Sequence, residues 1–230
     1  MRSPSAAPSR DDRAGRPRLK VARRSARPRP NSSAATTSVR IIGGAWRGRR
    51  LPVTMAEGLR PTPDRVRETL FNWLAPRIEG ARCLDLFAGT GALGLEALSR
   101  GAAHVQFVER DRQAIASLRA ALDTLDAAAR ATLVQGDALA LTLATPAPDV
   151  VFIDPPFAAE LHGPALDRVL AALPGHAQIY LEYPAQQTDA LHALFADRLD
   201  IRRAKRAGDV GYCLAQPRPA SEDDRASLIS

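Results

Sequence analysis

From about residue 81 onward, short apolar runs alternate with stretches whose apolar residues recur at helical spacing. Most of these runs end at or near a glycine, a proline or an acid, which is typical of buried parallel strands. The strands are expected at 83–87, 104–109, 131–135, 150–154, 178–183, 199–203 and 210–215. The helices are expected at 92–100, 112–129, 138–144, 162–173 and 185–197. This alternation predicts an α/β fold, a seven-stranded and mostly parallel sheet covered by helices on both faces.

The last two expected strands are separated only by residues 204–209. A parallel crossover needs roughly a dozen residues or more, so these two strands should pair antiparallel and close the sheet as a hairpin.

A smaller extension is expected ahead of the sheet. Residues 63–78 place apolar side chains on one helical face, with a start at Pro63 or Asp64 and an end near Pro76. Residues 39–53 contain two β-prone runs around Gly43 and Gly44, which predicts a short β-hairpin with a Gly-Gly turn.

Arginines are concentrated on this expected hairpin, with one aromatic residue among them. They are Arg40, Arg47, Arg49 and Arg50, and the aromatic residue is Trp46. Arginine interleaved with an aromatic ring suits an RNA-binding surface. A solvated hairpin face with a tryptophan in the core explains the same residues equally well.

Charge divides the chain unevenly. The 230 residues carry a formal net charge of +7, of which residues 1–38 contribute +8 and residues 39–230 contribute −1. Within the second part, residues 40–67 carry +5. Two adjacent basic segments indicate a polyanionic partner that approaches from the N-terminal side.

Composition suggests four segments: a tail at 1–38, the hairpin and helix at 39–78, the α/β domain at 79–217 and a flexible C-terminal tail at 218–230. Residues 1–38 are rich in Arg and Pro and poor in large apolar residues, so disorder is expected. This basic tail could be a nucleic-acid arm, an inert or mis-started extension, or an organelle transit peptide.

Several classes of protein are disfavoured. No apolar run reaches the ~18 residues that a membrane span needs. Cys83 and Cys213 each lie in an apolar strand and should be buried, reduced thiols. The histidines share no metal-ligand spacing with each other or with cysteine, so no metal site is expected.

A glycine loop follows the first strand of the expected sheet. Gly89, Gly91 and Gly94 match the spacing of the dinucleotide-binding fingerprint. Asp85, just before the loop, would repel a pyrophosphate but would suit an ammonium or sulfonium group. S-adenosylmethionine carries both groups, so the acid favours this cofactor over NAD.

Two further acids end the next two strands. Glu109 can accept hydrogen bonds from both ribose hydroxyls, although it could also be an exposed acid at a helix start. Asp137 is placed to accept from an adenine amino group, and it could equally be a helix N-cap.

The fourth strand ends in Asp154-Pro155-Pro156-Phe157. The prolines end the strand and leave a carboxylate, a carbonyl and an aromatic ring at its carboxyl end. The two oxygens can accept from an exocyclic NH₂ group while Phe157 stacks on the base. By itself the motif is more often a plain turn, but together with the three preceding acids it indicates an amino-methyltransferase. An NAD-dependent oxidoreductase leaves Asp85 and this motif unexplained, and a non-catalytic RNA-binding module has no use for the cofactor residues.

Residues 40–215 resemble the bacterial RsmD-type methyltransferases. The resemblance rests on residues 40–50, 60–71, 85–94 and 154–157, of which the first two stretches are specific to that family. It implies a Rossmann-like class I methyltransferase fold and transfer of a methyl group from S-adenosylmethionine to the N2 amine of a guanine in 16S ribosomal RNA. The alternative is a DNA or RNA adenine-N6 methyltransferase, which would use the same Asp-Pro-Pro-Phe chemistry.

The resemblance also implies the site residues and partners. The base would be held by Asp154, Pro155, Pro156 and Phe157. The cofactor would be held by Arg60, Thr62, Asp85, Phe87, Gly89, Gly91, Glu109, Asp137 and Ala138. The RNA would contact Arg40, Trp46, Arg47, Arg49 and Arg50. The expected partner is 16S ribosomal RNA or a small-subunit assembly, met in the cytoplasm by a monomer that needs neither a metal nor a membrane.

Overall fold

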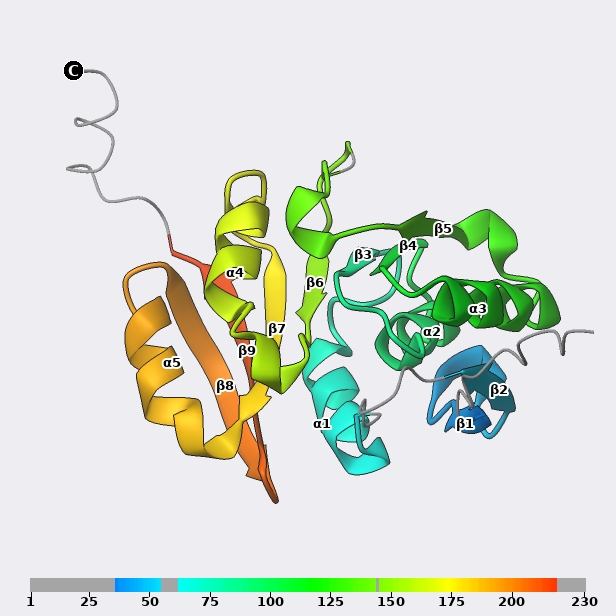
Figure 1. Ribbon diagram of the computed structural model, residues 1–230, viewed down its shortest axis with the longest axis horizontal. Helices are drawn as coiled ribbons and strands as arrows, with labels where there is room; N and C mark the ends of the chain where they lie inside the picture. The colour runs from blue at the N-terminus through cyan, green and yellow to red at the C-terminus, as the bar shows by residue number, and fades with distance from the viewer. Residues whose placement is uncertain (1–35, 55–61, 144, 219–230) are drawn as a thin grey trace, which may run out of the picture. The chain divides into compact units, whose positions relative to one another are not determined.

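The computed structural model describes residues 36–54, 62–143 and 145–218 (Figure 1). Its main sheet contains β3 (Arg82–Asp85), β4 (His104–Glu109), β5 (Ala131–Gln135), β6 (Val150–Ile153), β7 (Gln178–Pro184), β8 (Leu199–Ala207) and β9 (Val210–Pro217). The helices are α1 (Asp64–Leu74), α2 (Ala92–Ser99), α3 (Arg112–Thr124), α4 (His162–Leu170) and α5 (Thr188–Phe195). A separate two-stranded sheet pairs β1 (Thr36–Arg40) with β2 (Arg50–Thr54).

The strand order of the main sheet is β5-β4-β3-β6-β7-β9-β8. The strands from β5 to β7 are parallel, whereas β9 runs antiparallel to both β7 and β8. The predicted α/β fold and its terminal hairpin are therefore confirmed. The chain builds outward from β3 to β5 and then returns to place β6 on the other side of β3. The carboxyl ends of β3 and β6 thus form the switch point at which open α/β sheets bind ligands.

Side chains alternate between two cores because successive residues of a strand point to opposite faces. Cys83, Phe107 and Phe152 lie in one core, together with apolar residues of α1, α2 and α3. Leu84 and Val151 lie in the other, together with residues of α4 and α5. Each face of the sheet is thereby covered by helices, which holds the ends of β3 and β6 in fixed positions.

The helix expected at 138–144 is wrong. Only a 3₁₀ turn, η3 (Ala138–Ala140), forms, and the backbone at Leu141 is extended. Leu139, Leu141 and Leu143 alternate at a period of two and pack against the same core. Alternation at this period buries apolar side chains from an extended chain, and it was misread as helical because the segment is uniformly apolar.

The other expected helices are also shorter than predicted, α3 and α5 most clearly. α3 ends at Thr124, and the separate 3₁₀ turn η2 (Ala128–Arg130) follows it. Before α5, the chain forms the 3₁₀ turn η5 (Ala185–Gln187). In contrast, β8 and β9 extend beyond their predicted ends and meet at a tight turn, with Ala207 paired to Val210.

The N-terminal hairpin differs from the prediction in three respects. β1 begins at Thr36, inside the segment expected to be a disordered tail, because its first residues pair with the end of β2. Residues 41–49, including the 3₁₀ turn η1 (Gly44–Trp46), replace the expected Gly-Gly turn. Ile41 and Leu51 lie in the same core as α1 and the sheet, and the described residues form one compact unit, so no domain boundary separates 39–78 from 79–217. The rest of the predicted N-terminal tail and all but residue 218 of the C-terminal tail lie outside the described residues.

None of the described helices is long and apolar enough to cross a membrane.

Candidate functional site

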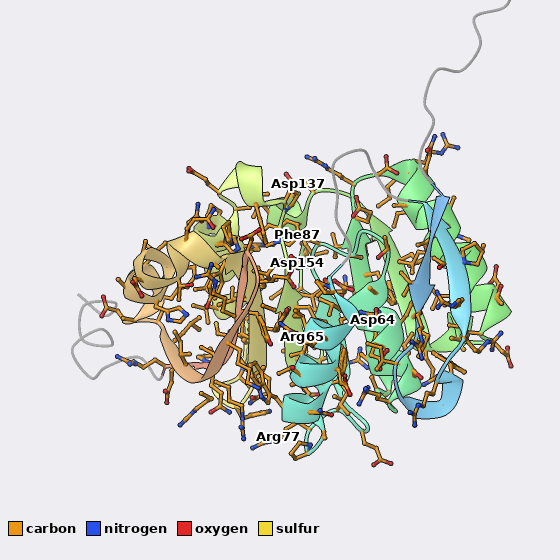
Figure 2. All side chains as sticks on the ribbon, turned by 90° about the horizontal axis from the view of Figure 1, so that it is seen from below. Asp64, Arg65, Arg77, Phe87, Asp137 and Asp154 are labelled. Atoms are coloured by element: carbon orange, nitrogen blue, oxygen red, sulfur yellow. The ribbon has the colours of Figure 1, made fainter. Side chains whose placement is uncertain are left out.

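The strand ends at the switch point bring the predicted site residues together. Asp85 ends β3, Glu109 ends β4, and Asp154 follows β6 immediately. Figure 2, which views the molecule from below, shows Phe87, Asp137 and Asp154 close to one another at this edge. Those predicted cofactor and base residues that end parallel strands therefore lie at one edge of the sheet.

The glycine loop packs tightly between β3 and α2. Gly91 has a φ of 76°, and a Cβ there would lie 2.4 Å from Leu118 Cδ1. A Cβ on Gly94 would lie 2.1 Å from the Phe107 ring. Because only glycine fits at these positions, α2 approaches the sheet closely enough for the Gly94 N–H to donate to Asp85 Oδ2 at 3.0 Å.

Glu109 holds two loops of the site in place. Its Oε2 accepts from the Gly89 N–H and its Oε1 from the Asp111 N–H, each at 2.8 Å. Each carboxylate oxygen can accept more than one hydrogen bond, so Glu109 can also receive a ligand hydroxyl. The carboxylate is therefore both a brace for the glycine loop and a candidate ligand group.

Asp137 adopts the capping role that the sequence left open. Its Oδ1 accepts from the Leu139 N–H at 2.9 Å, which caps η3. The residue is exposed, and the following Ala138 is buried. Capping uses one carboxylate oxygen, so the cap and a contact with a ligand are compatible.

The Asp154 motif forms a rigid corner with an exposed ring. Thr62 Oγ1 donates to Asp154 Oδ2 at 3.1 Å, so this predicted cofactor residue contacts the base-binding acid. Pro155 is buried, and Pro156 precedes the 3₁₀ turn η4 (Phe157–Ala159). Phe157 is 37% exposed, which leaves an aromatic face available for stacking. Arg60, also predicted at the cofactor, lies outside the described residues.

One site residue was missed by the sequence reasoning. Glu182 on β7 is 4% exposed, and its Oε2 accepts from the Tyr180 hydroxyl at 2.8 Å. Ile153 pairs with Leu181, so Glu182 occupies the position on β7 that corresponds to Asp154. The sequence did contain a signal for Glu182, because an acid interrupts the otherwise apolar run of this strand. The backbone carbonyl of Glu182 accepts from His162 Nε2 at 2.7 Å, which ties the strand end to α4.

These carboxyl groups have no positively charged partner among the described residues. Burial raises the pKa of Asp85 to about 7, despite the Gly94 N–H that favours its ionised form. Burial also raises the pKa of Asp154 and of Glu182, and the negative charge of Asp154 raises that of Glu182 further. None of these three acids forms an ion pair within the described part of the chain. Such an uncompensated cluster of acids favours a cationic ligand.

The predicted RNA-facing arginines lie together on the N-terminal hairpin. Arg40, Arg47, Arg49 and Arg50 are all exposed, and Arg49 donates to the Thr124 carbonyl at 3.1 Å. Trp46 differs from them because its ring is half-buried against the core, with the Arg130 guanidinium 5.2 Å from the ring centroid. This arrangement agrees with the alternative in which the Trp46 ring belongs to the core. The basic surface of the hairpin then consists of the four arginines.

A buried acid anchors this hairpin to the sheet domain. Glu96 on α2 is fully buried and accepts from the N–H groups of Ile42 and Gly43, both at 2.8 Å. Arg100 Nε donates to the same carboxylate at 2.7 Å, and Arg67 NH1 lies 3.7 Å from it. The hairpin is therefore held in a fixed position relative to the site, although nothing in the local sequence singled out Glu96.

No group of three or more His, Cys, Asp or Glu side chains that could hold a metal occurs among the described residues.

Known proteins are similar to this chain in sequence and in fold. Residues 39–216 match the family model described as "Conserved hypothetical protein 95". Over 199 residues the chain is 45% identical to ribosomal RNA small subunit methyltransferase D of Escherichia coli (strain K12), covering 85% of this chain and 98% of that protein. The chain belongs to the family of these rRNA small subunit methyltransferase D proteins. The resemblance seen in the sequence is thus confirmed.

Two further comparisons agree. The protein of the same description from Haemophilus influenzae is 42% identical over 188 residues, covering 79% of this chain and 95% of that protein. The solved structure of the yhhF protein from Escherichia coli superimposes with a TM-score of 0.69 at 44% identity, covering 80% of this chain and all of that one. The fold is accordingly the Rossmann-like class I methyltransferase fold, and the family implies a methyl donor.

Proposed function

We propose that this protein transfers the methyl group of S-adenosylmethionine to the exocyclic N2 amine of a guanine in 16S ribosomal RNA. The observation that carries this proposal is the position of Asp154-Pro155-Pro156-Phe157, which lies at the switch point beside an acid-lined glycine loop. Relatives that are 45% and 42% identical are named for small-subunit ribosomal RNA methylation. The choice of guanine N2 rests on the family resemblance of residues 40–50 and 60–71.

The chain's own residues fit S-adenosylmethionine. Its ammonium and sulfonium groups would offset the charge of the unpaired acids, with Asp85 nearest the glycine loop. Glu109 and Asp137 would accept from the ribose hydroxyls and the adenine amine, and Phe87 and Ala138 would border the adenosine. When bound, the sulfonium supplies an activated methyl group and a neutral leaving group.

Asp154 and the Pro155 carbonyl would orient the amine for attack. The lone pair of a guanine N2 is delocalised into the ring, so the free amine is a poor nucleophile. Two acceptors on its N–H groups favour a more tetrahedral nitrogen whose lone pair points at the methyl carbon. Positioning of this kind can contribute on the order of 7–11 kcal/mol. As the new C–N bond forms, the nitrogen would lose a proton, which the Asp154 carboxylate would accept.

Phe157 would stack on the flipped-out base, a contact worth ~1–3 kcal/mol. Thr62 holds the Asp154 side chain through the hydrogen bond at 3.1 Å and so limits its rotation. We further propose that the four exposed arginines of the N-terminal hairpin bind the ribosomal RNA, and that the protein acts as a monomer in the cytoplasm, where that RNA is made.

The test is methyl transfer to 16S ribosomal RNA from cells that lack the modification. We expect wild type to form N2-methylguanosine, and Asp154→Ala to lose at least about a hundredfold in rate, the contribution typical of a positioned acid-base group. Binding of S-adenosylhomocysteine should survive in the variant. Asp167→Ala, which removes an exposed carboxylate on α4, is the matched control and should keep wild-type turnover.

Two outcomes would contradict the proposal. Near-normal turnover of Asp154→Ala would remove this acid from the base site. Formation of N6-methyladenosine instead of N2-methylguanosine, mapped by mass spectrometry of the digested RNA, would favour the adenine alternative.

A further inference from the structure

A β-bulge in the edge strand β8 changes which way its cationic side chains point. Ile201 pairs with Ala215, whereas Arg203 pairs with Leu214, so the register shifts at Arg202. Before the bulge, Leu199 and Ile201 contact the core beneath α4 and α5. After it, Ala207 packs against the opposite core, the one shared with α1.

The shift turns Arg203 and Lys205 toward the face of the sheet that carries α1. Without the extra residue, the odd-numbered positions of β8 would continue on the α5 face because side chains alternate strictly along a strand. Bulges commonly re-aim a side chain next to a functional site. The bulge therefore places two cations on the same face of the sheet as Asp154.

A row of paired residues leads from these cations to the site. Lys205 pairs with Tyr212, and Tyr212 pairs with Glu182, which occupies the position next to Asp154. Neighbouring strands lie roughly 4.8 Å apart, so Lys205 is about 14 Å from Asp154 along this row. For a duplex that rises about 3.4 Å per nucleotide along its axis, this distance spans roughly four nucleotides measured along that axis.

Arg203 and Lys205 are also free to bind a partner. Both side chains are exposed, and neither forms an ion pair or hydrogen bond with another described residue. Their neighbours are engaged within the protein. Arg202 pairs with Asp200 at 2.9 Å, and Arg206 Nε donates to the Gly208 carbonyl at 2.7 Å.

The two basic regions flank the site from opposite sides. In Figures 1 and 2, α1 lies between the β1–β2 hairpin and the β8–β9 hairpin. Cations and β-bulges on an edge strand also protect it from pairing with another sheet, a role that does not depend on which face the cations occupy.

We propose that Arg203 and Lys205 bind the phosphate backbone of the RNA that flanks the methylated nucleotide, on the side opposite the N-terminal hairpin. This inference rests on the proposed function, because it takes the RNA strand to enter the site at Asp154. The RNA would then be held at two separated basic surfaces, and the target nucleotide would lie between them.

The test compares two double variants of the same strand. Arg203→Ala with Lys205→Ala removes the two free cations, and Arg202→Ala with Arg206→Ala removes the same charge from side chains already engaged within the protein. Binding of a 16S ribosomal RNA fragment is measured across a range of salt concentrations. For the first pair we expect about tenfold weaker binding at physiological salt, and a log-log salt slope shallower by about 1.4, since each single-strand phosphate contact contributes about 0.7.

The same variants are then compared in turnover. The KM for RNA should rise about tenfold in the Arg203 and Lys205 variant, while kcat and S-adenosylhomocysteine binding stay at wild-type values. Unchanged RNA affinity and an unchanged salt slope in the Arg203 and Lys205 variant would overturn the proposal. An equal loss in the control pair would also overturn it, because the effect would then come from the net positive charge of β8 and not from these two side chains. If wild type binds the RNA without methylating it, the proposed function fails, and the salt slopes still decide the role of Arg203 and Lys205.

Discussion

Replacing Glu96 by Gln should destabilise the protein more than any surface substitution. The carboxylate is fully buried and receives two backbone N–H groups and the Arg100 guanidinium, with Arg67 at 3.7 Å. Glutamine keeps one acceptor oxygen, and its NH₂ group would face a donor where the second oxygen was. Arg67 is 2% exposed, so water cannot replace the lost charge, and its Nε and NH1 atoms already have no hydrogen-bond partner within the described part of the chain.

The magnitude follows from these contacts. Removing one partner of a buried ion pair costs about 3–5 kcal/mol because the remaining charge stays buried without compensation. The Arg100 side chain is 19% exposed and can recover some hydration, and Arg67 keeps its contact with Asp64 at 2.6 Å. We therefore expect Glu96→Gln to lower the free energy of unfolding by about 3 kcal/mol, the lower end of that range.

The assay is equilibrium unfolding in urea near neutral pH, combined with hydrogen exchange of the Ile42 and Gly43 amides. Both amides should exchange faster in the variant because their acceptors are lost or weakened. Glu68→Gln on α1 is the matched control, since Glu68 is exposed and should change stability by no more than about 0.5 kcal/mol. A loss below about 1 kcal/mol in Glu96→Gln, with unchanged exchange, would refute the view that this carboxylate anchors the hairpin.

Two predictions concern the acids of the site. Because burial raises the pKa of Asp85 to about 7, the native state binds its proton more tightly than the unfolded chain, and this acid makes stability fall as pH rises from about 4 to about 7. In Asp85→Asn, urea titrations should show a smaller fall of the unfolding free energy with pH, and calorimetry should show weaker S-adenosylmethionine binding. An unchanged pH dependence of stability would contradict the burial of the Asp85 carboxyl. Glu182→Gln removes a negative neighbour of Asp154, so the acidic limb of the pH–rate profile should move to lower pH. A limb that stays in place would show that Glu182 does not influence the titration of Asp154.

Much of the fold was readable from the sequence, because buried parallel strands are short apolar runs that end at turn residues. The bounds of β4 and β5 were predicted correctly from such runs. The segment at 138–144 failed because alternating leucines pack equally well from an extended chain. β8 was cut short at residue 203 because its exposed second half carries no apolar signal, although backbone pairing with β9 continues to Ala207.

The sequence by itself determined the chemistry that the site offers: a glycine loop, acids at successive strand ends, and an acid-proline-proline-phenylalanine corner. These are local features, since each depends on what a residue type can do at the end of a strand. Only the tertiary structure decided which of them meet, because the strand order places β6 beside β3 and so brings Asp154 next to Asp85. It also decided the roles of Glu96 and Glu182, since burial is a property of the packed molecule. The direction of Lys205 was likewise set by a bulge, which exists only through pairing with β9.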